Sequence, residues 1–207
     1  MDLTVVIASF GDTRWLDLAQ ERAVPSLNDW DDTFVYHLGD TYDISVGQVR
    51  NMAVRASRAE GWLLFLDPDD QLAPGYIDIM LEATKRGSWT DLYVPALQLI
   101  RNGRPYEPQV LDDRDIINGL NPCPIGTLIH RDMFDRVGGF WDERAWEDWS
   151  LFRRAVLAGA ELRFVASAVY QAHETGQGRN STVTDPQQLR REIIESHADW
   201  ARRMEDT

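Results

Sequence analysis

The sequence GWLLFLDPDD, residues 61–70, joins an apolar run of strand length to a cluster of three carboxylates. Residues 62–66 show no polar alternation, which favours a strand that helices cover on both faces. Asp67, Asp69 and Asp70 follow this strand, and ligands of open α/β sheets bind beyond the carboxyl ends of the strands. Carboxylates at such a place suit a hard divalent cation. If the extended conformation continues through Pro68, the side chains of Asp67 and Asp69 point to the same side.

The same segment also has the composition of a turn followed by a helix. Asp70 can cap the next helix, and Pro74 suits the first turn of that helix. On these residues alone, a cation site and a capped turn are both open interpretations.

The overall charge limits the kind of partner. The 207 residues include 34 Asp and Glu and 21 Lys and Arg, which gives a net charge of -13. This balance argues against a broad nucleic-acid surface or an anionic membrane. The single cysteine, Cys123, excludes an intrachain disulfide, so a cytoplasmic protein is expected. Residues 1–12 have no basic start and no long apolar run, and we expect neither a signal peptide nor a membrane span.

Short apolar strands alternate with amphipathic helices in the first half. Strands are expected over residues 3–8, 33–38 and 61–66, and helices over residues 13–24, 46–59 and 75–86. This order predicts one α/β domain with a Rossmann-like mixed, mostly parallel sheet flanked by helices.

The second half is less regular. Further strands are expected over residues 91–100, 125–130, 162–165 and 168–171, and a helix or loop over residues 112–120. Helices are expected over residues 132–137, 147–158 and 186–203. Gly138 and Gly139 would end the first of these helices, and Asp185 would cap the last.

Two further groups can carry chemistry. Glu147 and Asp148 begin a predicted helix, whose partial positive charge favours an ionised carboxylate that can act as a base. Acids are also common in first helical turns simply because they stabilise helices. His173 directly follows an apolar strand, and it is either a ligand or a polar strand end.

Arg50, Asn51 and several tryptophans also allow both a ligand-binding and a structural interpretation. Arg50 and Asn51 can bind a phosphate or a base, although an arginine on a helix is often simply solvated. Trp141, Trp146 and Trp149 cluster around the acidic pair and either stack on a sugar face or fill the core.

Together these pieces resemble family 2 and related glycosyltransferases of the nucleotide-diphospho-sugar transferase (glycosyltransferase A) fold. TVVIASFGD, residues 4–12, resembles the first strand and the nucleotide-contacting loop. VGQVRNMAVRASRAEGWLLFLDPDD, residues 46–70, resembles the Ala-Arg-Asn helix and the strand that bears the Asp-x-Asp motif. Residues 126–165 resemble the acceptor-side segment, with its Gly-Gly-Phe and Glu-Asp pairs. The resemblance covers about residues 3–181.

The resemblance implies a metal-dependent, inverting transfer of a sugar from a nucleotide-diphosphate sugar, with UDP-sugars as the default donor and Mn²⁺ or Mg²⁺ as cofactor. It implies a nucleotide-sugar-binding half (residues 1–100), an acceptor and catalytic half (residues 101–184) and a C-terminal helix (residues 185–207). Asp148 would be the catalytic base and Glu147 would orient the base or the acceptor. The metal ligands would be Asp67, Asp69 and His173. The residues implied for the nucleotide sugar are Ala8, Phe10, Asp12, Asp40, Arg50, Asn51, Asp67, Arg179 and Ser181, and those for the acceptor side are Trp141 and Trp146.

The sequence departs from the family pattern at two places. The second strand ends in LGDTYD instead of the common paired acids, and Val49 replaces the small residue usual before Arg-Asn.

A second hypothesis is a non-catalytic module of the same fold that binds a nucleotide sugar or a glycan. The intact Asp67, Asp69, Asp148 and His173 argue against it. Nucleotidyl transfer is disfavoured because SFGDTRWLD is not a glycine-rich, basic phosphate loop. As acceptor we expect a protein or a soluble glycan, while the acidic charge disfavours a modified base in nucleic acid.

Overall fold

The computed structural model describes residues 2–39, 44–110, 116–117, 119, 121–174 and 183–205. Two four-stranded sheets form its centre. Their orders are β2 (Thr33–Leu38), β1 (Leu3–Phe10), β3 (Trp62–Phe65), β7 (Ile129–His130) and β4 (Gln71–Leu72), β8 (Leu162–Glu174), β5 (Leu92–Arg101), β6 (Arg104–Pro105).

The long strand pairs are parallel. β1 pairs in parallel with β2 and β3, and β5 pairs in parallel with β8, whereas the short β4, β6 and β7 run antiparallel to their neighbours. A bridge between Tyr93 and Leu128 connects the two sheets. The fold is therefore the mixed, mostly parallel α/β arrangement that the alternation of elements predicts.

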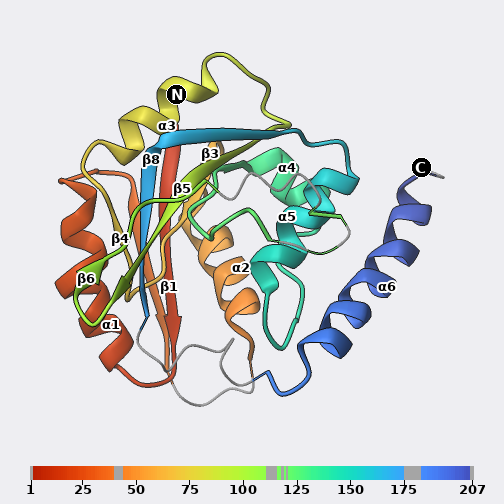
Figure 1. Cartoon of the computed structure of the whole chain (residues 1–207), viewed down its shortest axis with the longest axis horizontal. Coiled ribbons are helices and arrows are strands. Elements are labelled where there is room, and N and C mark those ends of the chain that lie inside the picture. The colour runs from red at the N-terminus through yellow and green to blue at the C-terminus, as the bar shows by residue number, and fades with distance from the viewer. Residues whose placement is uncertain are drawn as a thin grey trace.

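Helices flank the two sheets. They are α1 (Arg14–Leu18), which continues through irregular helical turns at Ala19–Ala23 and Val24–Leu27, then α2 (Val46–Ser57), α3 (Tyr76–Thr84), α4 (Arg131–Arg136), α5 (Glu147–Leu157) and α6 (Pro186–Glu205). In Figure 1, α2 lies between β1 and α5, and α6 packs against α5 at the edge of the molecule. Asp185 caps α6 as predicted, because its Oδ1 accepts a hydrogen bond from the Gln188 N–H at 2.9 Å.

The core explains the apolar run that precedes the acids. All of β3 and the first seven residues of β1 are buried, so neither strand has a solvent-facing side that would demand polar residues. None of the helices in the described ranges combines the length and the apolar character that crossing a bilayer requires.

Two predicted strands differ from the structure. Residues 162–171 belong to one strand, β8, because its pairing with β5 merely shifts register between Pro95 and Ala96, whose partners are Val165 and Val169. The extra residues make an irregularity within the strand instead of a turn between two strands. Of the strand predicted at residues 125–130 only Ile129–His130 forms, since the Thr127 N–H donates to the Pro124 carbonyl in a turn. The helix or loop predicted over residues 112–120 lies mostly outside the described residues.

The prediction that Asp70 caps the next helix is wrong. α3 begins after Gly75 without a side-chain cap. Asp70 is instead buried, and its carboxylate accepts hydrogen bonds from the Tyr170 hydroxyl and from the His173 backbone N–H, each at 2.8 Å. The Tyr170 hydroxyl also accepts a hydrogen bond from the Asp67 N–H at 3.3 Å. Asp70 therefore connects the end of β3 to β8.

Replacing Tyr170 by Phe should lower the free energy of unfolding by roughly 1–3 kcal/mol, because a buried carboxylate oxygen and a backbone N–H lose their partner. Urea denaturation measures this difference. Tyr36→Phe is the control, since the Tyr36 hydroxyl makes no hydrogen bond within the described part of the chain. Equal stability of the two variants would contradict the proposed connection.

Candidate active site

The segment after β3 is a tight turn. The Asp70 N–H donates to the Asp67 carbonyl oxygen at 3.1 Å, and the Arg22 guanidinium donates to the Asp69 carbonyl oxygen at 2.7 Å. The chain therefore does not stay extended through Pro68, so the condition under which Asp67 and Asp69 would point to the same side of a strand is not met. The turn nevertheless keeps the acids together. Burial and the charge of Asp67 raise the pKa of Asp69 to about 6.

A buried arginine joins this turn to the second acidic segment. Arg50, on α2, is 4% exposed, and it donates to Asp67 Oδ1 at 2.5 Å and to Glu147 Oε1 at 2.7 Å. Burial alone would lower the pKa of Arg50, but the two carboxylates raise it above its ordinary value. Arg50 thus stays charged and holds the acid after β3 next to the first residue of α5.

The first turns of α2 pack closely against the segment before α5. Ser45 and Gln48 form a capping box that fixes the first turn of the helix. A Cβ at Gly47 would lie 2.9 Å from the Trp141 carbonyl oxygen, so only glycine lets α2 approach this closely. Asn51 donates to the Phe140 carbonyl at 2.7 Å and accepts from the Phe140 N–H at 2.9 Å. Asn51, predicted to contact the nucleotide, therefore anchors α2 to the segment before α5.

The second acidic pair, Glu147 and Asp148, lies at the start of α5. Trp146 has a left-handed backbone, with φ 62°, and this turn makes Glu147 and Asp148 the first two residues of the helix. Asp148 Oδ1 accepts from the Trp149 N–H at 2.8 Å, and Oδ2 accepts from Asn121 Nδ2 at 2.9 Å. Burial, and next the charge of Glu147, raise the pKa of Asp148 to about 7. Such a pKa suits a general base at neutral pH.

His173, in β8, lies beside the turn. Its backbone N–H binds Asp70, and its ring Nε2 is 2.9 Å from Gln71 Oε1. Burial and the charge of Arg22 lower the pKa of His173, which favours the neutral ring. A role of His173 as a metal ligand stays a prediction.

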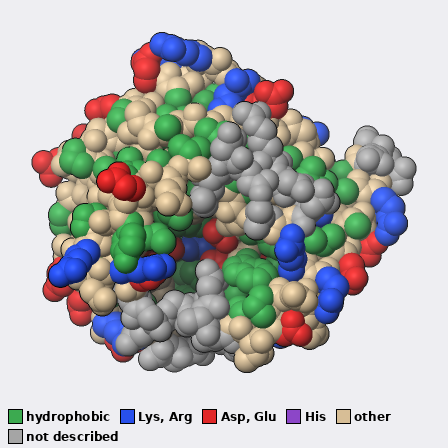
Figure 2. Space-filling view, in the orientation of Figure 1, with side chains coloured by type: hydrophobic (Ala, Val, Ile, Leu, Met, Phe, Trp, Pro, Cys, Tyr) green, Lys and Arg blue, Asp and Glu red, His purple; other side chains and the backbone are tan. Residues whose placement is uncertain are grey.

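Acidic and basic side chains lie together at the bottom of a hollow in the face shown in Figure 2. Within the described ranges, no three His, Cys, Asp or Glu side chains are arranged to hold a metal ion by themselves. A Mg²⁺-type ion on a nucleotide needs only one or two carboxylates, because the phosphates supply further oxygens. Asp69 fits this requirement, since it forms no ion pair with another described residue, whereas Asp67 is already paired with Arg50.

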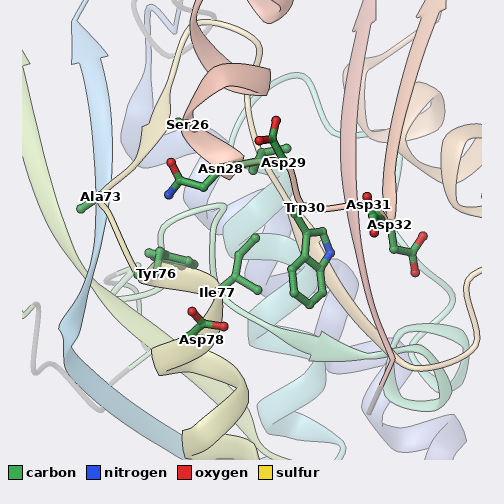
Figure 3. A pocket seen from close by; sticks show the side chains of 12 residues that line it. Ser26, Asn28, Asp29, Trp30, Asp31, Asp32, Ala73, Tyr76, Ile77 and Asp78 are labelled. Atoms are coloured by element: carbon green, nitrogen blue, oxygen red, sulfur yellow. The ribbon is translucent and has the colours of Figure 1, made fainter.

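A second hollow, of about 400 Å³, lies elsewhere, near the starts of β2 and α3. Figure 3 shows Trp30, Tyr76 and Ile77 in its wall, with the carboxylates of Asp29 and Asp78 among the side chains around it. None of the residues predicted for the site lines this hollow. The carboxyl ends of the strands therefore remain the candidate site.

The other residues predicted for the nucleotide sugar belong to β1 and the turn after it, or lie outside the described residues. Asp12 is exposed after β1 and accepts a hydrogen bond from the Arg14 N–H at 2.9 Å. Phe10 ends β1, and Ala8 is buried in the core. Asp40, Arg179 and Ser181 lie outside the described residues.

The two tryptophans predicted for the acceptor side, Trp141 and Trp146, differ in their surroundings. The Trp141 ring packs against the Arg154 guanidinium, 4.3 Å from the ring centroid, and edge-on against His197 and Trp200 of α6. Trp141 therefore links α5 to α6. Trp146 lies directly before the acidic pair and stays a candidate for acceptor contact.

Three residues that hold the acidic side chains of the site were not predicted from the sequence. Tyr170 holds Asp70, Arg22 holds the Asp69 carbonyl, and Asn121 holds Asp148. These partners are separated by 100, 47 and 27 residues respectively, so no local pattern marks them.

Comparison with solved structures identifies the fold. S. aureus TarS 1–349 in complex with UDP-GlcNAc matches 96% of this chain with a TM-score of 0.66 and 18% identity. GalNAc-T7 with UDP, GalNAc and Mn²⁺ matches 93% of it with a TM-score of 0.59 and 14% identity. The chain has the glycosyltransferase A fold.

The likeness concerns structure more than sequence. The chain spans 66% of the TarS 1–349 chain and 48% of the GalNAc-T7 chain. No protein-family model matches the sequence, and no curated protein matches it. The resemblance stated from the motifs is thus confirmed for the glycosyltransferase A fold.

Arg50→Met should lower the free energy of unfolding by roughly 3–5 kcal/mol, because it leaves Asp67 and Glu147 without their buried counter-charge. Chemical denaturation tests this, with the exposed Arg55→Met on the same helix as control. Adding Glu147→Gln to Arg50→Met should recover part of the loss. If Arg50→Met is no more harmful than Arg55→Met, Arg50 does not hold the two segments together.

Asp148→Asn should become more stabilising, relative to wild type, as the pH rises. The pKa of Asp148 is raised from an ordinary 3.8 to about 7 in the folded state. The wild type therefore loses stability as the pH rises between these two values, because the folded state resists the ionisation of Asp148, while the asparagine variant has no such group to ionise. Thermal unfolding of both proteins at pH 4 and pH 8 should show a relative gain of roughly 1–3 kcal/mol for the variant, less than the full shift implies because Asp148 is only partly buried. A pH-independent difference would contradict the raised pKa.

Proposed function

We propose that this chain is a glycosyltransferase that moves a sugar from a nucleotide-diphosphate sugar to a hydroxyl group of an acceptor. The observation that carries this proposal is the Arg50 bridge, which sets an acidic turn after β3 beside an acidic helix start at the carboxyl ends of parallel strands. The fold supports it, because TarS and GalNAc-T7 have the same fold and their structures contain UDP-GlcNAc or UDP.

On the donor side, Asp69 would bind a divalent cation together with the diphosphate, and Asp67 would contribute as far as its pairing with Arg50 allows. Mn²⁺ or Mg²⁺ bound there would act as a Lewis acid on the diphosphate. GalNAc-T7 was determined with Mn²⁺, which favours this ion for a first test. Asp12 is the described candidate for contact with the nucleoside.

On the acceptor side, Asp148 would accept the proton of the acceptor hydroxyl as its oxygen attacks the anomeric carbon. The bond between that carbon and the diphosphate oxygen breaks, and the electron pair leaves with the nucleoside diphosphate. Attack from the face opposite the diphosphate inverts the configuration in one step. Glu147 is held by Arg50 and would orient the base or the acceptor.

The acceptor is proposed to be a protein or a soluble glycan. The net charge of -13 disfavours a nucleic acid carrying a modified base, because its phosphates would be repelled.

UDP release from UDP-GlcNAc, UDP-GalNAc and UDP-glucose in the presence of Mn²⁺ tests the proposal. Wild type should release UDP, slowly even without acceptor, and EDTA or Asp69→Ala should abolish the release. Asp148→Asn should lower turnover by about 10²–10⁴-fold while UDP binding persists. Asp142→Asn, an exposed acid of the same segment, is the control and should keep wild-type turnover.

Two outcomes would contradict parts of this scheme. UDP binding without turnover on any donor would favour the non-catalytic binding module. A parallel loss of UDP binding and turnover in Asp148→Asn would remove Asp148 from the role of base.

A further inference from the structure

We propose that Asn121 is a positioning residue that holds the carboxylate of Asp148 in the orientation required of a base. This inference rests on the proposed function, because it concerns how the base is prepared. It assigns a role to the loop before β7, a segment in which the sequence analysis found no functional residue.

The contacts of Asn121 are specific. Its Nδ2 donates to Asp148 Oδ2 at 2.9 Å, while its Oδ1 accepts from the Cys123 backbone N–H at 3.1 Å. The second bond fixes which way the amide faces, because only Nδ2 can donate and only Oδ1 can accept. Asn121 therefore presents a donor, and not an acceptor, to Asp148.

The carboxylate is thereby held at both oxygens. The Trp149 N–H occupies one site on Oδ1, and Asn121 occupies one site on Oδ2. Each carboxylate oxygen has a second lone-pair direction, so each can still accept a hydrogen bond from an acceptor hydroxyl. Two donors in fixed positions leave the carboxylate plane little freedom to rotate, and such preorganisation favours proton transfer at the moment of attack.

The electrostatic surroundings make this donor important. Burial opposes the ionisation of Asp148 most strongly, and the charges of Glu147 and Asp67 add to it, while the Trp149 N–H and Arg50 favour ionisation. Cys123, which titrates in the same loop as Asn121, is a neutral thiol because burial and the charge of Asp148 raise its pKa. Arg50 donates its hydrogen bonds to Asp67 and Glu147. Among the described residues, the side-chain amide of Asn121 donates to Asp148 and to no other carboxylate.

Substituting Asn121 tests the inference by a pKa measurement and by kinetics. Asn121→Ala removes the donor and should raise the pKa of Asp148 by about one unit. Asn121→Asp keeps the acceptor for the Cys123 N–H but places a carboxyl group against Asp148, so the rise should be larger. The pKa is read from an NMR titration of the Asp148 side-chain carboxyl carbon, and the acidic limb of the pH profile of kcat/KM should move by the same amount.

Cys123→Ala is the matched control, because it alters a buried side chain of the same loop and keeps the backbone N–H that Asn121 binds. It should shift the Asp148 pKa and the acidic limb by much less than Asn121→Ala does, because the Cys123 thiol is neutral. UDP affinity should be unchanged in all three variants, which separates positioning of the base from general damage to the fold.

Three results would overturn the inference: an Asp148 pKa that stays within about 0.3 of wild type in Asn121→Ala, an equal shift in Cys123→Ala, or a shifted pKa with an unmoved kcat/KM profile. If wild type releases no UDP, the proposed function fails. The NMR titration then still decides whether Asn121 controls the ionisation of Asp148.

Discussion

One buried cation between two acids is the interaction on which the site depends. Arg50 is removed from water, which is costly, and the cost is offset because Asp67 and Glu147 both bind the guanidinium. The bridge forms only if α2 packs closely against the segment before α5, and Gly47 and Asn51 provide that close packing. The acidic turn and the acidic helix start are thus held together by the folded chain itself.

The features that follow from local sequence were predictable. β2 has the predicted bounds, Thr33–Leu38, and α5 begins at Glu147 as its apolar periodicity and acidic first turn indicate. The unbroken apolar run before Asp67 correctly indicates a strand buried on both faces. The alternation of these elements predicted the mixed, mostly parallel sheet, and the resemblance of the motifs to known glycosyltransferases implied the glycosyltransferase A fold.

Features that depend on distant partners were not predictable. Asp70 has the local chemistry of a helix cap, but the Tyr170 hydroxyl, 100 residues away, and the buried position decide its role. Asn51 and Trp141 make tertiary packing contacts whose partners a pattern of residue types cannot reveal. The irregularity in β8 likewise reflects its pairing with β5, and not its own turn propensity.

A crystal structure of the chain grown with UDP and Mn²⁺ tests most directly whether the two acidic segments form one donor site. The diphosphate should lie beside the turn of Asp67 to Asp70, with the cation at Asp69 and with Arg50 still bound to Glu147. UDP bound instead in the hollow beside Trp30, or a diphosphate far from both acidic segments, would contradict this placement of the active site.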